Sequence, residues 1–113
     1  MNETALLDDP ILPRLKKELE ALYGTRLKRV LLYGSRARGD HQPDSDYDVL
    51  VVLEGPVDRR AELERLSALS ARLTWDTVTN KNPVVASFKA VTEETLASRT
   101  GFMHNVRNEA VEL

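Results

Sequence analysis

The sequence predicts an α/β or α+β fold, in which a small mixed β-sheet is flanked by helices. Two apolar runs, 27–34 and 46–55, are typical of buried strands, and only a short polar turn separates them. That turn is too short for a helical crossover, so we expect the two strands to be antiparallel neighbours. Amphipathic patterns before and after this pair, over 9–24 and 57–73, predict the flanking helices.

The first predicted helix, 9–24, carries clear signals at both ends. Asp9 can cap it, and Pro10 suits the first helical position because the missing N–H is harmless there. Gly24 is typical of a helix stop. The apolar positions recur at helical spacing, as Ile11, Leu12, Leu15, Leu19 and Leu22.

The second predicted helix, 57–73, follows the second strand. Asp58 or Pro56 would start it, because both residue types favour helix N-termini. Four leucines are expected near one buried stripe: Leu63, Leu66, Leu69 and Leu73.

The remaining chain is predicted as a strand over 84–91, an earlier short strand over 75–79 and a short helix over 92–99 with Thr92 as its cap. Tyr47 and Trp75 are interpreted as core residues. Residues 100–113 form a mixed tail with a final strand. This tail either folds back on the domain or docks on a partner, and the sequence leaves both readings open.

Length and composition narrow the class of protein. The 113 residues predict one domain, 1–113, and the net charge of −2 gives no basic footprint for nucleic acid. The absence of cysteine excludes disulfides and thiolate metal sites. No apolar run approaches the roughly 20 residues of a membrane span, and the acidic N-terminus is unlike a secretory signal. A soluble, cytoplasmic protein is therefore expected, with its oligomeric state open.

Two carboxylates stand at the start of the second strand, Asp46 and Asp48. Residues at i and i+2 of a strand point to the same side, roughly 6.5 to 7 Å apart along the backbone. Two such carboxylates disfavour each other's ionisation, and a hard divalent cation removes that penalty. Mg²⁺ commonly takes one or two carboxylates together with water and substrate phosphates. The pair therefore predicts a Mg²⁺–nucleotide site.

A phosphate cradle is predicted at the end of the first strand, at Gly34-Ser35. If a short helix begins near Ser35, free backbone N–H groups there would favour an anion. Glycine lets a phosphate approach closely, and the serine hydroxyl can donate to it. Arg36 or Arg38 could add charge-assisted contacts.

These elements together resemble the signature of the nucleotidyltransferase superfamily related to DNA polymerase β. The signature is Gly-Ser, ten residues, then Asp-x-Asp, here Gly34-Ser35 and Asp46-Tyr47-Asp48. The resemblance covers the motif core 27–54 and, for so short a chain, is closest to the minimal nucleotidyltransferases of bacteria and archaea.

The resemblance implies transfer of a nucleoside monophosphate from a triphosphate to a hydroxyl, with release of pyrophosphate. Gly34, Ser35, Arg36 and Arg38 would hold ATP, and Asp46 and Asp48 would bind Mg²⁺ as the catalytic acids. Minimal members often act as antitoxins that attach AMP to a small helical HEPN-domain toxin. This implies a toxin partner for the chain.

The sequence departs from the family in one respect. Members carry a third active-site carboxylate on a later strand, and none is evident here. The strand predicted at 84–91 offers Ser87 and Lys89 but no acid, and Asp76 is the nearest alternative. A second hypothesis is therefore a weakened domain that neutralises a partner by contact. Transfer to a small molecule is a third, although the chain leaves little room for a substrate domain.

Overall fold

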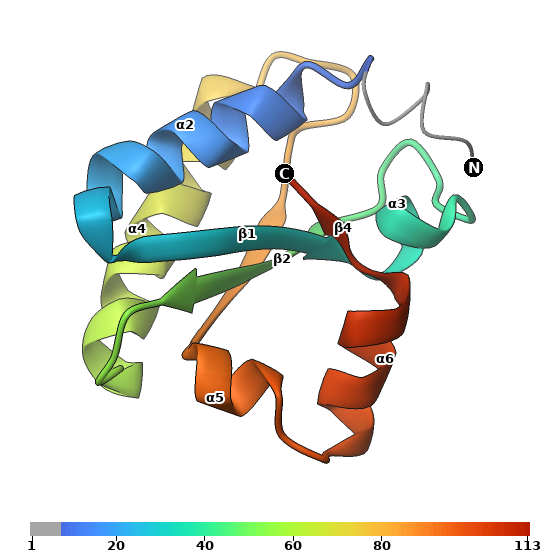
Figure 1. The fold of residues 1–113 in the computed structure, drawn as a ribbon. Helices are drawn as coiled ribbons and strands as arrows, with labels where there is room; N and C mark the ends of the chain where they lie inside the picture. The colour runs from blue at the N-terminus through green and yellow to red at the C-terminus, as the bar shows by residue number, and fades with distance from the viewer. Residues whose placement is uncertain (1–7) are drawn as a thin grey trace.

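The computed structural model describes residues 8–113, and these contain a four-stranded sheet in the order β3-β2-β1-β4. The strands are β1 (Leu27–Tyr33), β2 (Tyr47–Leu53), β3 (Ala86–Val91) and β4 (Val111–Glu112). β1 is antiparallel to both β2 and β4, whereas β2 and β3 are parallel. The mixed sheet and the antiparallel central pair are as predicted (Figure 1).

Helices α2 (Ile11–Tyr23) and α4 (Arg59–Asp76) cover one face of the sheet. Side chains from alternate positions of β1 and β2 point into this layer, where removal of apolar surface from water stabilises the fold. The fully buried members include Leu15, Leu19, Val30, Leu32, Val49, Val51 and Leu73.

Helices α5 (Glu93–Leu96) and α6 (Gly101–Glu109) cover the opposite face. Figure 1 shows them on the other side of the strands from α2 and α4. Their core is smaller and consists of Leu31, Leu50, Val52, Val91, Leu96, Met103 and Val106. Asp48 alternates with Tyr47 along β2 and so points to this second face, together with Leu50.

Capping signals predicted from the sequence operate at several helix ends. Asp9 Oδ1 accepts from the Ile11 N–H at 2.9 Å, and Asp58 accepts from the first backbone N–H groups of α4. Thr92 caps α5 by accepting from the Thr95 N–H. Helix α2 ends at Tyr23, and Gly24, which has φ of 56°, follows as its C-cap and begins a short 3-10 turn.

The strand predicted at 75–79 is wrong. Helix α4 continues to Asp76, and the Thr77 hydroxyl donates to the Leu73 carbonyl at 2.9 Å, which satisfies the end of the helix instead of a sheet ladder. Trp75 is consequently on the surface, with 75% of its area exposed, rather than in the core.

The leucine stripe predicted for α4 is shifted by one position. Leu63 is 63% exposed, and the neighbouring Glu62 is buried in its place, whereas the other three predicted leucines are buried. Glu62 can be buried because three donors reach its carboxylate: the Tyr23 hydroxyl and the guanidinium groups of Arg26 and Arg65.

Residues 101–109, predicted only as part of a mixed tail, form helix α6. Thr100 caps it by accepting from the Met103 N–H at 3.1 Å. The final strand is present as β4, which pairs Val111 with Leu32. The tail therefore folds back onto the sheet beside β1.

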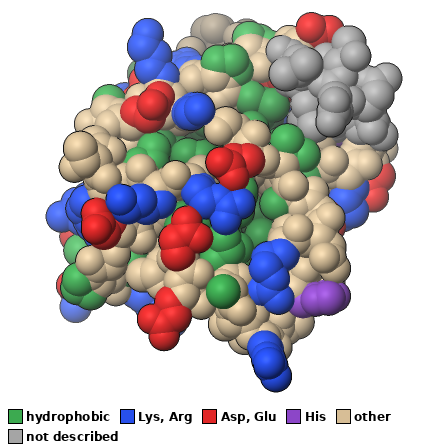
Figure 2. All heavy atoms as spheres, viewed as in Figure 1, with side chains coloured by type: hydrophobic (Ala, Val, Ile, Leu, Met, Phe, Trp, Pro, Cys, Tyr) green, Lys and Arg blue, Asp and Glu red, His purple; other side chains and the backbone are tan. Residues whose placement is uncertain are grey.

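Within residues 8–113 there is no helix whose length and apolarity would let it cross a membrane. Lys, Arg, Asp and Glu side chains are interspersed on the face shown in Figure 2, without a block of one sign.

Candidate active site

Gly34 and Asp48 lie close together at the centre of the candidate site. Gly34 has φ of 78°, and a Cβ atom placed on it would lie 2.3 Å from Asp48 Oδ2. The pairing of β1 with β2 makes this contact, because Tyr33 is the register partner of Asp48. Glycine is needed here both for its backbone angles and for the approach of the carboxylate. The two halves of the predicted motif are thus brought together.

A single helical turn, α3 (Ser35–Arg38), follows Gly34 directly. The Gly34 carbonyl accepts from the N–H groups of Ala37 and Arg38, at 3.1 and 3.0 Å. Ser35 thus opens the short helix expected from the sequence. It lies half-buried at the end of β1 that adjoins the start of β2, where Asp46 is exposed to solvent.

Arg36 points away from this cradle and into the loop between the motif halves. Its guanidinium donates to the carbonyls of Ser45 (3.0 Å) and Pro43 (3.2 Å) and stacks on the Tyr47 ring, 4.0 Å from the centroid. The Tyr47 hydroxyl donates in turn to Asp9 at 2.7 Å. Arg36 is only 9% exposed. Its contacts hold the loop that leads into Asp46, because Nε and Nη2 are both committed to carbonyls of that loop.

Arg38 lies on the other side of α3 and is exposed. Its Nη1 donates to both carboxylate oxygens of Glu109, at 3.4 and 3.2 Å, and its Nε donates to Asp40. Glu109 Oε1 also accepts from the Gly34 backbone N–H at 3.1 Å. Glu109 was not predicted as a site residue, because nothing in its spacing points to a position 75 residues back along the chain.

The electrostatics of Asp48 reflect this neighbourhood. Burial raises the pKa of Asp48, the carboxylate of Asp46 raises it further, the Arg38 guanidinium lowers it, and Glu109 raises it again, so that the net shift is upward. The carboxylates of Asp46 and Glu109 thus oppose ionisation of Asp48. A divalent cation would relieve this repulsion.

The third carboxylate does not come from Asp76. Its Oδ2 accepts from Arg14 Nη2 at 2.6 Å on the face covered by α2 and α4, opposite the face to which Asp48 points. On β3, the register partner of Asp48 is Ser87. A hydroxyl thus stands at the strand position beside Asp48.

The oxygen atoms around Asp48 fit a magnesium ion that takes most of its ligands from the phosphates of a nucleotide and from water. Within residues 8–113, no three His, Asp or Glu side chains are arranged to hold a metal by themselves. Asp46 and Asp48 would supply two hard oxygen donors, and phosphates and water the others, which is the usual way in which Mg²⁺ is held.

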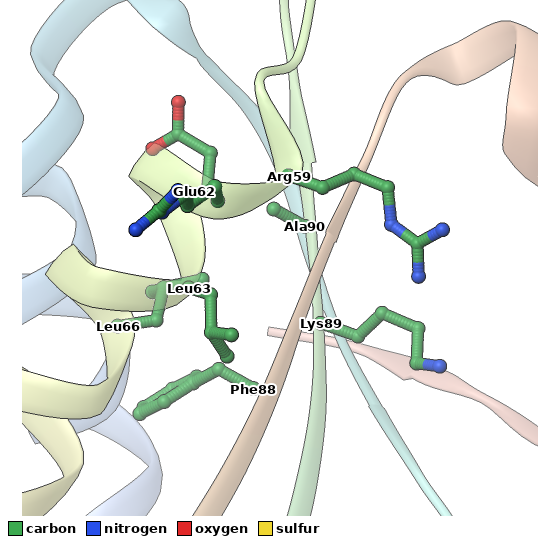
Figure 3. A pocket seen from close by; sticks show the side chains of 8 residues that line it. Arg59, Glu62, Leu63, Leu66, Phe88, Lys89 and Ala90 are labelled. Carbon is green, nitrogen blue, oxygen red and sulfur yellow. The ribbon is translucent and has the colours of Figure 1, made fainter.

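A cavity of about 460 Å³ lies elsewhere, between α4 and β3. In Figure 3, Leu63 faces Phe88 inside it, while the side chains of Arg59 and Lys89 extend together to one side. Neither Asp46 nor Asp48 lines it. The candidate site is consequently identified from the convergence of charged groups and not from a hollow in the surface.

Comparison with known proteins decides the family. The model of the nucleotidyltransferase domain family matches residues 12–98, which include β1, α3, β2 and β3. The chain belongs to the nucleotidyltransferase domain family. The residues that converge around Gly34 and Asp48 lie within the matched segment, except for Glu109.

Individual relatives of this nucleotidyltransferase come from Methanocaldococcus jannaschii. One, named "Putative protein adenylyltransferase", is 27% identical over 103 residues, which cover 91% of this chain and 95% of the relative. A second protein with the same description is 48% identical over 40 residues, or 35% of this chain and 38% of the relative.

Two solved structures share the fold. One is a toxin–antitoxin crystal structure with AMP-PNP, at a TM-score of 0.54 and 20% identity, over 84% of this chain and 66% of the other. The second is a mutant of the toxin–antitoxin pair MntA–HpeT, at a TM-score of 0.54 and 18% identity, over 100% of this chain and 72% of the other. The nucleotidyltransferase thus spans about two thirds of those chains.

Proposed function

We propose that the chain is a Mg²⁺-dependent nucleotidyltransferase that transfers AMP from ATP to a hydroxyl group of a protein partner. One observation carries the proposal: the Asp48 carboxylate lies directly against Gly34, at the start of the Gly-Ser turn. Nucleotidyl transfer needs metal-binding acids and a phosphate cradle side by side, and the pairing of β1 with β2 supports these roles because it brings Asp48 beside the end of β1.

Each proposed site residue has a distinct role. Gly34 and Ser35 would hold the triphosphate through backbone N–H groups and the serine hydroxyl. The Arg38 guanidinium would form an ion pair with the negatively charged phosphates. Asp46 and Asp48 would hold Mg²⁺, which supplies charge neutralisation to the leaving pyrophosphate and lowers the pKa of the attacking hydroxyl. We assign Arg36 to positioning, because its guanidinium is committed to the Pro43 and Ser45 carbonyls.

In the proposed reaction the acceptor oxygen forms a bond to the α-phosphorus as the bond to pyrophosphate breaks. The hydroxyl proton leaves to a carboxylate or to water. Most of the rate enhancement would come from positioning and electrostatics, as in phosphoryl transfer generally. Residues 1–113 would act as one nucleotidyltransferase domain around the motif core 27–54.

The proposed acceptor is a toxin, in a pair for which this chain is the antitoxin. The names of the Methanocaldococcus relatives and the fold shared with toxin–antitoxin structures support this assignment. The motif's resemblance to minimal nucleotidyltransferases points further to a small helical HEPN-domain toxin, in the cytoplasm. Nucleic acid is not the proposed acceptor.

A second function is favoured by one observation, the presence of Ser87 beside Asp48 where a third carboxylate would complete the family's site. With only two acids, the domain could neutralise its partner by contact, with or without bound nucleotide. This reading predicts that neutralisation survives the loss of both acids.

The deciding experiment measures transfer of label from α-labelled ATP, with Mg²⁺, to the protein itself, to a co-purified partner and to host lysate. We expect a labelled acceptor with the wild type and none with the double variant Asp46→Asn/Asp48→Asn. Asp44→Asn is the matched control, because Asp44 is exposed in the same loop. Absence of label from folded wild type with its partner present would contradict transfer and leave the contact function.

A further inference from the structure

The carboxylate of Glu109 occupies the donors that the proposed function assigns to phosphate. Glu109 Oε1 accepts from the Gly34 N–H at 3.1 Å, and Oε1 and Oε2 both accept from Arg38 Nη1. A phosphate would use the same two kinds of donor, a backbone N–H and a guanidinium, and would carry more charge. Carboxylate and phosphate therefore cannot both hold these donors fully.

The position of Glu109 is set by its neighbours on both sides. One helical turn earlier, Val106 is buried among the residues of the second core, and two residues later Val111 pairs with Leu32 of β1. The backbone that carries Glu109 is consequently anchored by β4, which lies beside β1 in Figure 1. The carboxylate can leave by rotation about side-chain torsions alone, and its side chain is 24% exposed, so an anion can reach it from solvent.

The local chemistry of α6 does not favour an acid at this position. Glu109 is the last residue of α6, where the helix dipole presents partial negative charge and disfavours a carboxylate. The carboxylate of Asp48 adds to that cost, because it lies within electrostatic reach of both Glu109 and Arg38. Contacts with Gly34 and Arg38 offset the cost, and a bound polyphosphate would remove both contacts.

We propose that Glu109 is a built-in competitor for the phosphate subsite: it holds the Gly34 N–H and Arg38 in the free protein, and the triphosphate displaces it on binding. The proposal rests on the proposed function for the identity of the ligand. Displacing Glu109 breaks its hydrogen bonds to Gly34 and Arg38. The affinity of the protein for nucleotide is therefore lower than it would be without the Glu109 carboxylate. Binding also frees the Glu109 carboxylate at the end of α6.

The test measures binding of inorganic tripolyphosphate, with Mg²⁺, by calorimetry for the wild type and Glu109→Gln. The amide keeps the size and the hydrogen-bond acceptor but not the charge. We expect tripolyphosphate to bind the variant about tenfold more tightly, equivalent to about 1.4 kcal/mol. Equal or weaker binding by Glu109→Gln would overturn the proposal and reduce Glu109 to a structural tie between α6 and β1.

Glu112→Gln is the matched control, because Glu112 lies in the same terminal segment but pairs with Arg29, at 2.8 Å, outside the cradle. Its affinity for tripolyphosphate should equal that of the wild type, and a similar gain in this control would overturn the proposal. The Gly34 amide resonance is a second readout. It should shift on Glu109→Gln, and should shift on adding tripolyphosphate to the wild type.

Transfer from α-labelled ATP separates failure of this proposal from failure of the proposed function. If the wild type transfers AMP but Glu109→Gln binds tripolyphosphate no better, only the competitor role is wrong. If wild type and variant neither transfer nor bind tripolyphosphate, the proposed function fails and the competitor role fails with it. Tighter binding by the variant without transfer by either protein supports the competitor role in a domain that binds nucleotide but lacks activity.

Discussion

Gly34 leaves no room for a side chain, because its Cβ position lies 2.3 Å from Asp48 Oδ2. We predict that Gly34→Ala lowers stability by about 1–3 kcal/mol, since φ of 78° with ψ of −159° is strained for other residues. The displaced Asp48 should also weaken binding of Mg²⁺. Thermal unfolding with and without Mg²⁺ measures both effects. Gly101→Ala is the control, because open space surrounds that position, and its melting temperature should stay within a degree or two of the wild type.

The two arginines of α3 should separate stability from nucleotide binding. Arg36→Ala removes the donors to Pro43 and Ser45 and the stacking on Tyr47, and we expect it to cost about 1–3 kcal/mol of stability. Arg38→Ala breaks only exposed pairs and should leave stability nearly unchanged, because solvent screens such pairs. It should nevertheless weaken binding of ATP about tenfold. Urea unfolding and calorimetry on both variants check this, and a large stability loss for Arg38→Ala would contradict it.

Ser87→Asp should supply the missing acid, because Ser87 is the register partner of Asp48 and is exposed. A third carboxylate beside the other two should tighten binding of Mg²⁺ several-fold, since hard oxygen donors and added negative charge both favour the ion. Calorimetric titration with MgCl₂ measures the effect. Ala68→Asp, exposed on α4 and outside the hollow that Ser87 lines, provides the control and should bind Mg²⁺ like the wild type. Unchanged affinity in Ser87→Asp would show that β3 does not face the metal.

Glu62 should make stability depend on pH in the acid range. Burial raises the pKa of Glu62, but hydrogen bonds from Arg65, Tyr23 and Arg26 lower it more, so the net shift is below its ordinary value of 4.5. A folded-state pKa below the unfolded one gives stability that is present above pH 4.5 and lost as pH falls through the folded value. Urea unfolding between pH 7 and pH 3 should therefore show a loss that is smaller in Glu62→Gln.

At neutral pH the same buried carboxylate should be costly to remove. Glu62 is 3% exposed, and Glu62→Ala leaves two guanidinium groups and a hydroxyl without their shared partner, which should cost about 3 kcal/mol. Glu64→Ala is the control on the same helix, because its pair with Arg60 is exposed on both sides. That variant should lie within about 0.5 kcal/mol of the wild type.

Features with short-range signals could be predicted from the sequence. The antiparallel pair β1–β2 followed from two apolar runs joined by a short turn, and this pairing alone places Asp48 against Gly34. Helix caps at Asp58 and Thr92 also followed from local residue preferences. Each of these depends on residues within a few positions of one another, where spacing translates directly into geometry.

Two kinds of feature were harder to predict from the sequence. One is which of two nearby helix positions is buried, and the other is contact between residues far apart in the chain. Arg36 and Arg38 look equivalent in the sequence, but two positions of a helix differ by about 200°, so one is buried and the other exposed. Leu63 and Glu62 exchanged their expected burial because Tyr23, Arg26 and Arg65 lie within reach of the carboxylate. Glu109 reaches Gly34 only because β4 pairs with β1, which no local pattern indicates.

Strand β3, one of the two outer strands of the sheet, has a consequence for the tendency of the protein to aggregate. In the described part of the chain, β3 pairs with β2 on one side only, so its other backbone edge could template pairing with a second molecule. The side chains along it alternate, and Lys89 places a charge at mid-strand, with its Nζ 5.0 Å from the Phe102 ring centroid. A charged residue there would have to be buried if two such edges joined, and lysine on an edge strand is a common barrier to that association. We therefore expect Lys89 to disfavour aggregation of the folded protein through this edge.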